Sequence, residues 1–292
     1  MPDPAKPTIL DRLSTDLLRI LPQHLLAAGM YRVARATTPW LKDLLISRVS
    51  QRYNVDISEA EQPDPSAYPS FNAFFTRALR AGSRPVAEGE VVSPADGRIS
   101  QIGPIRGGRL LQAKGHEFEL LALLAGDKEK TAAFHDGQFA TVYLSPKDYH
   151  RVHLPFAGTL DSMVFVPGEL FSVSDATTQL VPGLFARNER VICHFATDLG
   201  PMAVILVGAI FVGSMETVWH GEVRGQRGQP TRWVYRDNER RHFDTGDEIG
   251  RFNMGSTVIT LLPAGAAAWD EGIGAASTVR MGQAIGHPLP QP

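Results

Sequence analysis

The stretch Arg251–Leu262 reads "RFNMGSTVITLL" and joins a small, flexible step to a run of β-branched and aliphatic residues. The run "TVITLL" has the composition of a buried strand. Gly255 and Ser256 stand directly before it, and both residue types are common in turns, because glycine supplies backbone freedom and serine caps the turn. The stretch therefore predicts a buried strand entered through a turn. It leaves open why a bare Gly-Ser pair stands at that entrance.

The sequence around this strand, over residues 91–292, has the texture of a β-rich domain. Strand-like runs such as "FATVYL" and "RVICHFAT" alternate with turns rich in Gly, Pro and Asp. Two late phrases, "FDTGDEIGRF" and "VRMGQAIGHP", share the pattern G-x-x-I-G, a weak internal repeat that suggests similar hairpin corners. We predict an α+β fold, in which N-terminal amphipathic helices precede a barrel-like or sandwich-like catalytic domain.

The residues before this domain fall into two parts. Residues 1–57 contain "TDLLRILPQHLLAAGMYRVA" and "PWLKDLLISRVSQRY", where apolar residues recur at the three-and-four spacing of amphipathic helices. Residues 1–55 carry eight basic and four acidic side chains, although the whole chain has a formal net charge of -2. A basic amphipathic segment suits anionic lipid surfaces, and it suits an ordinary helical subdomain equally well. Residues 58–90 are predicted to form a linker with a short helix at "FNAFFTRALR".

The composition excludes several classes of protein. With 43% hydrophobic and 21% charged residues in 292, the chain is an ordinary globular protein with a sizeable core. The near-neutral net charge gives no global basic field for nucleic acid. The single cysteine, Cys193, excludes an intramolecular disulfide and a cysteine-based zinc site. We expect no signal peptide, since residues 1–10 lack the charged-then-apolar order of one. We expect no membrane span, since the apolar run at 199–215 is interrupted by glycines and a proline.

Three positions in the β-rich part carry groups suited to catalysis. Asp96 lies in the turn "SPADGRI", His150 and His153 lie in "DYHRVHLPFAG", and Ser256 lies in the opening stretch. A serine hydroxyl becomes nucleophilic when an imidazole takes its proton, and a carboxylate fixes the tautomer of that imidazole. Asp96, His153 and Ser256 could therefore form a triad, although Asp-Gly turns and loop histidines are also common without a catalytic role. On an extended chain the two histidines point to opposite faces, so we expect no metal held by both.

Five phrases in sequence order resemble the bacterial phosphatidylserine decarboxylases, a family of pyruvoyl-dependent enzymes associated with the membrane. They are "FNAFFTR", "VSPADGRI", "YHRVHLPFAG", "VGAIFVGSMETVW" and "MGSTVI", spread over nearly the whole chain. Each phrase alone is modest, but five in the right order are highly specific. One departure is Met254, where bacterial members usually carry leucine. Methionine is a soft apolar residue of similar size, so we expect little effect.

The resemblance implies that the chain cuts itself between Gly255 and Ser256. Glycine has no Cβ, so its carbonyl carbon is open to attack by the next residue. By the family's mechanism, His153, oriented by Asp96, deprotonates Ser256, and the hydroxyl attacks the Gly255 carbonyl to give an ester. Elimination then leaves a dehydroalanine, which hydrolyses to a pyruvoyl group and ammonia.

The resemblance also implies the products and the later reaction. Self-cleavage would give a large chain, 1–255, and a small chain, 256–292, which begins with the pyruvoyl group at position 256. In the family this covalent cofactor forms a Schiff base with the amine of phosphatidylserine and accepts the electron pair left by CO2, so neither PLP nor a metal is needed. The family pattern assigns His150 the return of a proton to Cα. The lipid product is phosphatidylethanolamine.

The resemblance favours the lipid-binding interpretation of residues 1–57. It implies a peripheral protein at the cytoplasmic face of the inner cell membrane, with its active site held at the bilayer that contains the substrate. Family members often form homodimers, and the resemblance implies no nucleic-acid partner.

Three other functions would each carry a distinct signature. A serine hydrolase with the same triad would keep an intact chain, and its Ser256 would react with a fluorophosphonate. A non-enzymatic carrier would need a modifiable lysine at a hairpin tip, which neither G-x-x-I-G phrase contains. A metal enzyme that uses His150 and His153 would lose activity to chelators.

Overall fold

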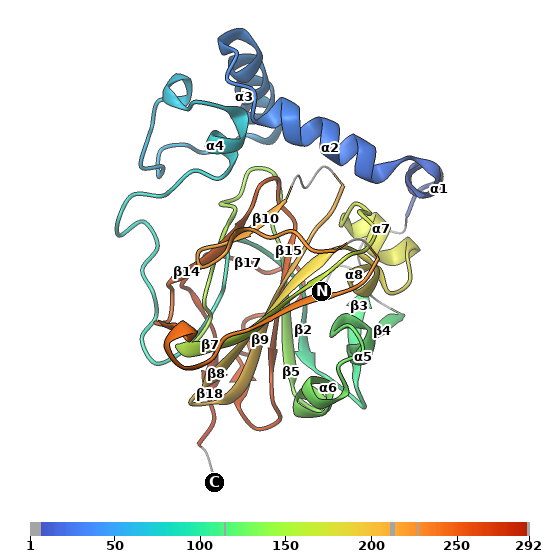
Figure 1. Ribbon diagram of the computed structural model, residues 1–292, viewed down its shortest axis with the longest axis vertical. Helices are drawn as coiled ribbons and strands as arrows, with labels where there is room; N and C mark the ends of the chain where they lie inside the picture. Colours follow the sequence, from blue (N-terminus) through green and yellow to red (C-terminus); the bar gives the residue numbers. More distant parts are fainter. Residues whose placement is uncertain (1–6, 114, 211–213, 227, 291–292) are drawn as a thin grey trace.

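The computed structural model describes residues 7–113, 115–210, 214–226 and 228–290. Along the chain it places helices first, then a linker, then a group of antiparallel sheets (Figure 1). This arrangement confirms a mixed helix-and-sheet fold. Residues 1–6 of the predicted helical region and 291–292 of the predicted small chain lie outside the described residues.

The N-terminal part contains helices α1 (Ile9–Ile20), α2 (Gln23–Ala34) and α3 (Pro39–Tyr53). A capping box starts α1: the Thr8 hydroxyl accepts the Asp11 N–H (3.1 Å), and the Asp11 carboxylate accepts the Thr8 N–H (2.8 Å). Pro22 separates α1 from α2, because proline has no N–H to donate within a helix. The helices lie together at one end of the molecule, at the top of Figure 1, and the C-terminus lies at the other.

Shorter helices occur in the linker and among the strands. They are η1 (Pro65–Ala67), α4 (Phe71–Phe75), α5 (Leu120–Leu123), α6 (Lys128–Phe134), α7 (Asp175–Leu180), α8 (Leu184–Arg187) and η2 (Asp237–Glu239). The structure describes no helix long and apolar enough to cross a bilayer.

Within the described residues the largest sheet has nine strands, in the order β12-β7-β8-β9-β15-β5-β2-β17, with β13 also paired to β7. The strands are β2 (Gly97–Pro104), β5 (Gln138–Tyr143), β7 (Gly158–Val166), β8 (Arg190–Thr197), β9 (Gly200–Val207), β12 (Thr231–Val234), β13 (His242–Phe243), β15 (Thr257–Leu262) and β17 (Thr278–Val279). Strand β15 is the run "TVITLL". All 6 of its residues are buried, and it pairs with β5 on one side and β9 on the other. The predicted buried strand is confirmed.

The barrel alternative is wrong, because this sheet stays open in the described part of the chain. Its path ends at β12 on one side and at β17 on the other, and these end strands pair only with β7 and β2. A closed barrel needs end strands that are long enough and registered to pair with each other. Strand β17 offers only Thr278 and Val279. The sandwich-like alternative remains compatible with the antiparallel sheets.

Smaller sheets complete the β-rich part. One has the order β1 (Val91–Val92), β18 (Ala284–Pro288), β16 (Ala267–Trp269); another has the order β11 (Gly221–Glu222), β10 (Met215–Thr217), β14 (Glu248–Phe252), β6 (Arg151–His153); and β3 (Arg109–Ala113) pairs with β4 (His116–Glu119). Both G-x-x-I-G phrases start with a left-handed glycine turn into a strand. Gly246 (φ +87) precedes β14, and Gly282 (φ +82) precedes β18.

Candidate active site

Gly255 and Ser256 lie at the entrance of β15, in the middle of the main sheet. The Ser256 side chain is buried, and its hydroxyl oxygen lies 3.3 Å from that of Thr257. The Ser256 carbonyl accepts the Leu144 N–H (2.9 Å), which extends the β5–β15 ladder by one step. The serine hydroxyl is therefore enclosed beside its own preceding peptide bond.

The His150 ring lies directly against Gly255. A Cβ at position 255 would be 2.2 Å from Cε1 and 2.4 Å from Nδ1 of this ring, so only glycine fits there. The ring also stacks on Phe75, with centroids 4.0 Å apart. Burial, helped by the nearby charge of Arg77, lowers the pKa of His150 to about 3, and backbone contacts only partly oppose this. The ring beside Gly255 is thus neutral at physiological pH.

The phrase "FNAFFTR" contains α4, which contacts the segment before Gly255. Ser70 caps the helix by accepting the Ala73 N–H (3.2 Å). The Asn72 amide donates to Asn253 (3.1 Å), which in turn donates to the Ser214 hydroxyl (2.7 Å). Sequence reasoning assigned no role to these asparagines. Asn72 lies inside a family phrase and Asn253 directly before one, and neither position by itself indicated a role.

Arg77, which closes the same phrase, adds a buried positive charge. Its side chain donates to the Lys147 carbonyl (3.1 Å) and lies over the Phe74 ring at 5.4 Å. Burial lowers the pKa of Arg77 itself, because removing the guanidinium from water disfavours its charged form. Sequence reasoning missed this residue too, because a single arginine after a run of aromatic residues carries no specific signal.

His153, three residues after His150, lies in strand β6 and has different neighbours. Its Nδ1 is 2.8 Å from the Gly246 carbonyl oxygen, and its Nε2 is 3.1 Å from the Tyr149 hydroxyl. Burial lowers the pKa of His153, while the hydrogen bond to Gly246 opposes that shift. His153 is therefore also neutral at physiological pH.

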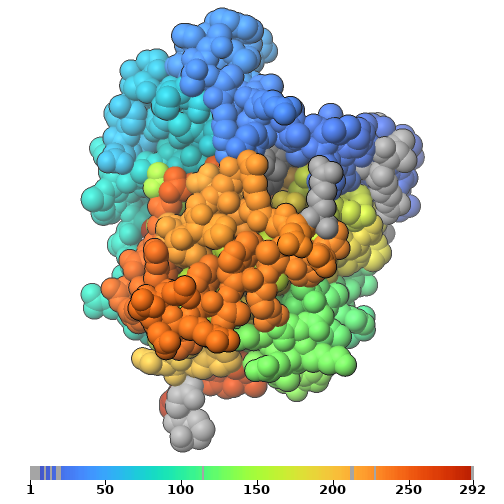
Figure 2. Space-filling view, in the orientation of Figure 1, coloured from blue at the N-terminus to red at the C-terminus, as the bar shows by residue number. Residues whose placement is uncertain are grey.

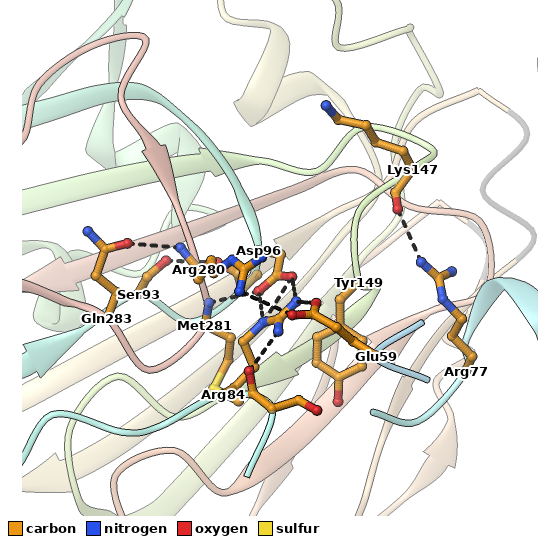
Figure 3. A network of polar contacts seen from close by, with 12 residues as sticks. Glu59, Arg77, Arg84, Ser93, Asp96, Lys147, Tyr149, Arg280, Met281 and Gln283 are labelled. Atoms are coloured by element: carbon orange, nitrogen blue, oxygen red, sulfur yellow. Dashed lines mark hydrogen bonds and ion pairs between the residues drawn. The ribbon is translucent and has the colours of Figure 1, made fainter. Parts of the chain in front are cut away.

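Asp96 lies in a polar network with Arg84 (Figure 3). Arg84 donates from Nε to both Asp96 oxygens (2.8 and 3.1 Å) and from Nη2 to one of them (2.5 Å). Asp96 also accepts the Met281 N–H (2.9 Å), and Arg84 forms an ion pair with Glu59 (2.8 Å). These contacts raise the pKa of Arg84 and tie the linker, the "SPADG" turn and the C-terminal segment together.

The predicted residues are thus brought into one region without forming a complete hydrogen-bonded chain. Among the hydrogen bonds of the described residues, none joins Asp96 to His153, and none joins either histidine to the Ser256 hydroxyl. The Asp96 charge is nevertheless close enough to favour protonation of His153. The direct contact with Gly255 is made by His150. In the described ranges, no three His, Cys, Asp or Glu side chains are grouped for a metal.

A groove of about 1020 Å³ runs between α2 and the β-rich part. Its lining residues include Tyr31 and Arg32 of α2, and Ser214, whose hydroxyl bonds to Asn253. Tyr31 donates to Glu222 (3.0 Å) across the groove. The groove therefore reaches the residues that support Gly255 from the side that carries the N-terminal helices.

Comparison with known proteins places these features in a family. A family model described as Phosphatidylserine decarboxylase matches residues 71–287, and one described as PSD matches residues 13–54. A protein of Methylococcus capsulatus named phosphatidylserine decarboxylase proenzyme is 54% identical over 278 residues, covering 94% of this chain and 96% of its own. Proteins of the same name from Acidovorax ebreus and Pseudomonas aeruginosa are 53% and 52% identical, each covering 95% of this chain and 98% of its own.

Proposed function

Because the chain belongs to the phosphatidylserine decarboxylase family and is a decarboxylase, we propose that it matures by cutting itself between Gly255 and Ser256. The mature enzyme then converts phosphatidylserine to phosphatidylethanolamine and CO2. One observation carries the proposal: a neutral imidazole fills the space that a Cβ would need at Gly255, beside the buried hydroxyl of Ser256. A serine hydrolase would instead need its hydroxyl exposed to an outside substrate.

In the self-cleavage, the Ser256 hydroxyl oxygen bonds to the Gly255 carbonyl carbon and the peptide C–N bond breaks, leaving an ester. His153 takes the hydroxyl proton, with Asp96 favouring the charged ring that results. Both histidines can accept a proton at neutral pH because burial keeps both rings neutral. The ring returns this proton to the released nitrogen of residue 256, and elimination then separates residues 1–255 from a chain 256–292 that begins with dehydroalanine. Water converts this dehydroalanine to the pyruvoyl group, with loss of ammonia.

A second distribution of roles is favoured by one contact. His150, and not His153, touches the scissile Gly255. His150 could then serve as the base of self-cleavage, while His153 would act without contacting Gly255. The single substitutions His150→Ala and His153→Ala separate the two distributions.

In the decarboxylation, the pyruvoyl group supplies a carbonyl that binds the substrate amine and draws off the electron pair left by CO2. The residues around position 256 fit such a group, because the site is buried and β15 is fixed on both sides by hydrogen-bonded neighbours. His150 lies next to this position and is the residue proposed to return a proton to the substrate Cα. Its contact with Phe75 holds the ring in place.

The N-terminal helices are proposed to hold the enzyme on the membrane without spanning it. Large apolar side chains are exposed on all three helices, among them Leu13, Leu25 and Trp40. Figure 2 shows these helices, in blue, lying across one end of the molecule. An apolar surface with basic neighbours binds anionic lipid. This supports a peripheral location at the cytoplasmic face of the cell membrane, with the groove beneath α2 open to the lipid.

Intact mass spectrometry tests the proposal. The purified protein should give two chains divided after Gly255, and the smaller one should react with hydroxylamine at its N-terminal ketone. Ser256→Ala should give one uncleaved, inactive chain. A cleaved Ser256→Ala protein, or a wild-type chain that stays intact and reacts with a fluorophosphonate at Ser256, would contradict the proposal.

A further inference from the structure

The two G-x-x-I-G phrases form structurally equivalent corners. In the first corner, residues 244–250, the Asp244 N–H donates to the Asp247 carboxylate (2.8 Å), and the Asp247 N–H donates to the Asp244 carbonyl (3.1 Å). The Gly246 N–H donates to the Leu154 carbonyl (2.9 Å), and the Leu154 N–H donates to the Asp247 carbonyl (2.9 Å). These last two hydrogen bonds attach the corner to the segment that follows His153.

The second corner, residues 280–286, repeats each of these bonds. The Arg280 N–H donates to the Gln283 side chain (3.1 Å), and the Gln283 N–H donates to the Arg280 carbonyl (3.1 Å). The Gly282 N–H donates to the Ser93 carbonyl (3.0 Å), and the Ser93 N–H donates to the Gln283 carbonyl (2.8 Å). Ser93 therefore corresponds to Leu154, and hydrogen bonds attach this corner to the segment that leads to Asp96.

The segments around Ser93 and Leu154 also form a reciprocal pair of hydrogen bonds with each other. The Val92 N–H donates to the Pro155 carbonyl (2.9 Å), and the His153 N–H donates to the Pro94 carbonyl (2.8 Å). The halves are therefore related by a local two-fold arrangement, in which Val92 occupies the place of His153. A hydrogen bond that occurs in both halves is part of their common backbone architecture. A hydrogen bond that occurs in only one half has a cause specific to that half.

The two corners differ in the donor that binds the carbonyl of their first glycine. The Gly282 carbonyl accepts a backbone N–H, that of Ala87 (2.9 Å), as a structural corner would. The Gly246 carbonyl instead accepts from His153 Nδ1 (2.8 Å). Because a carbonyl oxygen only accepts, Nδ1 carries the proton and Nε2 has the free electron pair. The Tyr149 hydroxyl, 3.1 Å from Nε2, is therefore the donor to that pair.

We propose that Tyr149 and the Gly246 carbonyl are positioning groups for self-cleavage, which hold His153 in its Nδ1-protonated form with Nε2 as the basic atom. The inference rests on the proposed self-cleavage. The carbonyl does for the ring what a carboxylate does in other triads, namely fix its tautomer. Tyr149 is buried, and burial raises the pKa of its hydroxyl, which therefore remains a donor at physiological pH. Asp96, bound by Arg84, acts on His153 only through its charge.

The tautomer can be measured without any cleavage. In uncleaved Ser256→Ala protein labelled with 15N-histidine, the His153 signals, identified by their loss in His153→Gln, should show a protonated Nδ1 and an unprotonated Nε2. A proton on Nε2 would overturn the inference. Because Tyr149 is intact in this sample, the result does not depend on the folding of a tyrosine variant.

The pH dependence of cleavage gives the second test. Tyr149→Phe removes a donor to the neutral ring, so the charged ring becomes easier to form and the neutral base is lost at a higher pH. The pH of half-maximal cleavage rate should rise by roughly 0.5–1, as expected for one hydrogen bond. Tyr68→Phe is the matched control, since Tyr68 is also buried but donates to the Gln62 carbonyl (2.8 Å).

The outcomes of this test separate the inference from the proposed function. A Tyr149→Phe chain that cleaves with the wild-type midpoint would overturn the inference and leave self-cleavage standing. A wild-type chain that never cleaves would contradict the proposed function, and the tautomer measurement would then still decide the inference. A shifted midpoint in Tyr149→Phe with an unshifted one in Tyr68→Phe supports both.

Discussion

Gly255 combines two requirements in one residue: an accessible carbonyl and room for an imidazole. Replacing it with alanine would put a Cβ 2.2 Å from Cε1 of His150, so the ring or the backbone must move. We expect Gly255→Ala to fold but to leave little or no cleaved chain on a denaturing gel. Gly272→Ala is the control, because a Cβ at Gly272 meets nothing within 4 Å. Normal cleavage of Gly255→Ala would show that the contact with His150 is not needed.

The division of work between the two histidines is the next residue-scale question. If His153 is the base of self-cleavage, His153→Ala should reduce cleavage by a factor of about 100 or more, in the range of lost general-base catalysis. His150→Ala should then still cleave but decarboxylate poorly. Cleavage time courses and CO2 release from phosphatidylserine measure the two steps separately. The reverse pattern, with cleavage lost only in His150→Ala, would assign the base to the residue that touches Gly255.

At the scale of elements, the strand β15 was predictable and the sheet around it was not. A run of β-branched residues after Gly255 and Ser256 identifies a buried strand because composition and burial are local properties. Whether nine strands close into a barrel depends on the length and register of distant end strands such as β17. The mixed fold could therefore be read from the sequence, and its closure could not.

The same limit applies to the candidate site. The phrases that contain Asp96, His150, His153 and Ser256 are visible in the sequence, and the structure brings them into one region. The partners of these residues come from far along the chain: the carbonyl that binds His153 is 93 positions away. A backbone carbonyl also carries no residue type by which it could be recognised. Only the repeated G-x-x-I-G pattern hinted that this corner mattered.

The helix α1 offers a prediction at the element scale. Ile9, Leu13 and Leu17 are exposed, and their spacing of four residues places them on one face. Leu13→Ser with Leu17→Ser should weaken binding to anionic vesicles by about tenfold or more, since a buried leucine contributes about 1.5–3 kcal/mol. Cosedimentation measures this. Val218→Ser with Val234→Ser is the control, because these exposed valines lie in the β-rich part. Equal binding of all variants would make α1 an ordinary packed helix.

At the scale of the whole molecule, the proposed cut divides the chain without dividing the fold. The small chain, 256–292, would contribute β15 to the centre of the main sheet, β17 to its edge, and β16 and β18 to the three-stranded sheet. Strand β15 pairs with both neighbours over nearly its full length. The two chains should therefore elute together from a gel-filtration column in native buffer and separate only in denaturant. Separation under native conditions would contradict this prediction.

The whole molecule also holds several titratable groups in their neutral forms, which makes its stability depend on pH. Burial lowers the pKa of His150 to about 3 and of His194 to about 4, and it lowers the pKa of His153 as well. Unfolded histidines have a pKa of about 6.5. Between these values the unfolded chain binds more protons, so acid favours unfolding. Burial raises the pKa of Glu189 to about 7, and this group acts in the opposite direction, because the folded chain binds its proton first.

In acid the three histidines lower the free energy of unfolding and the one glutamate raises it. We therefore expect the free energy of unfolding to fall as the pH drops from 7 to 4.5, by on the order of 2–4 kcal/mol. Urea unfolding of the uncleaved Ser256→Ala protein measures it without complications from self-cleavage. Glu189→Gln should make the fall steeper, because it removes the one contribution that grows in acid. His194→Gln should make it shallower, because it removes a group on β8 that the unfolded chain protonates before the folded chain does. A stability that stays flat over this pH range, or the opposite order of the two variants, would contradict this prediction.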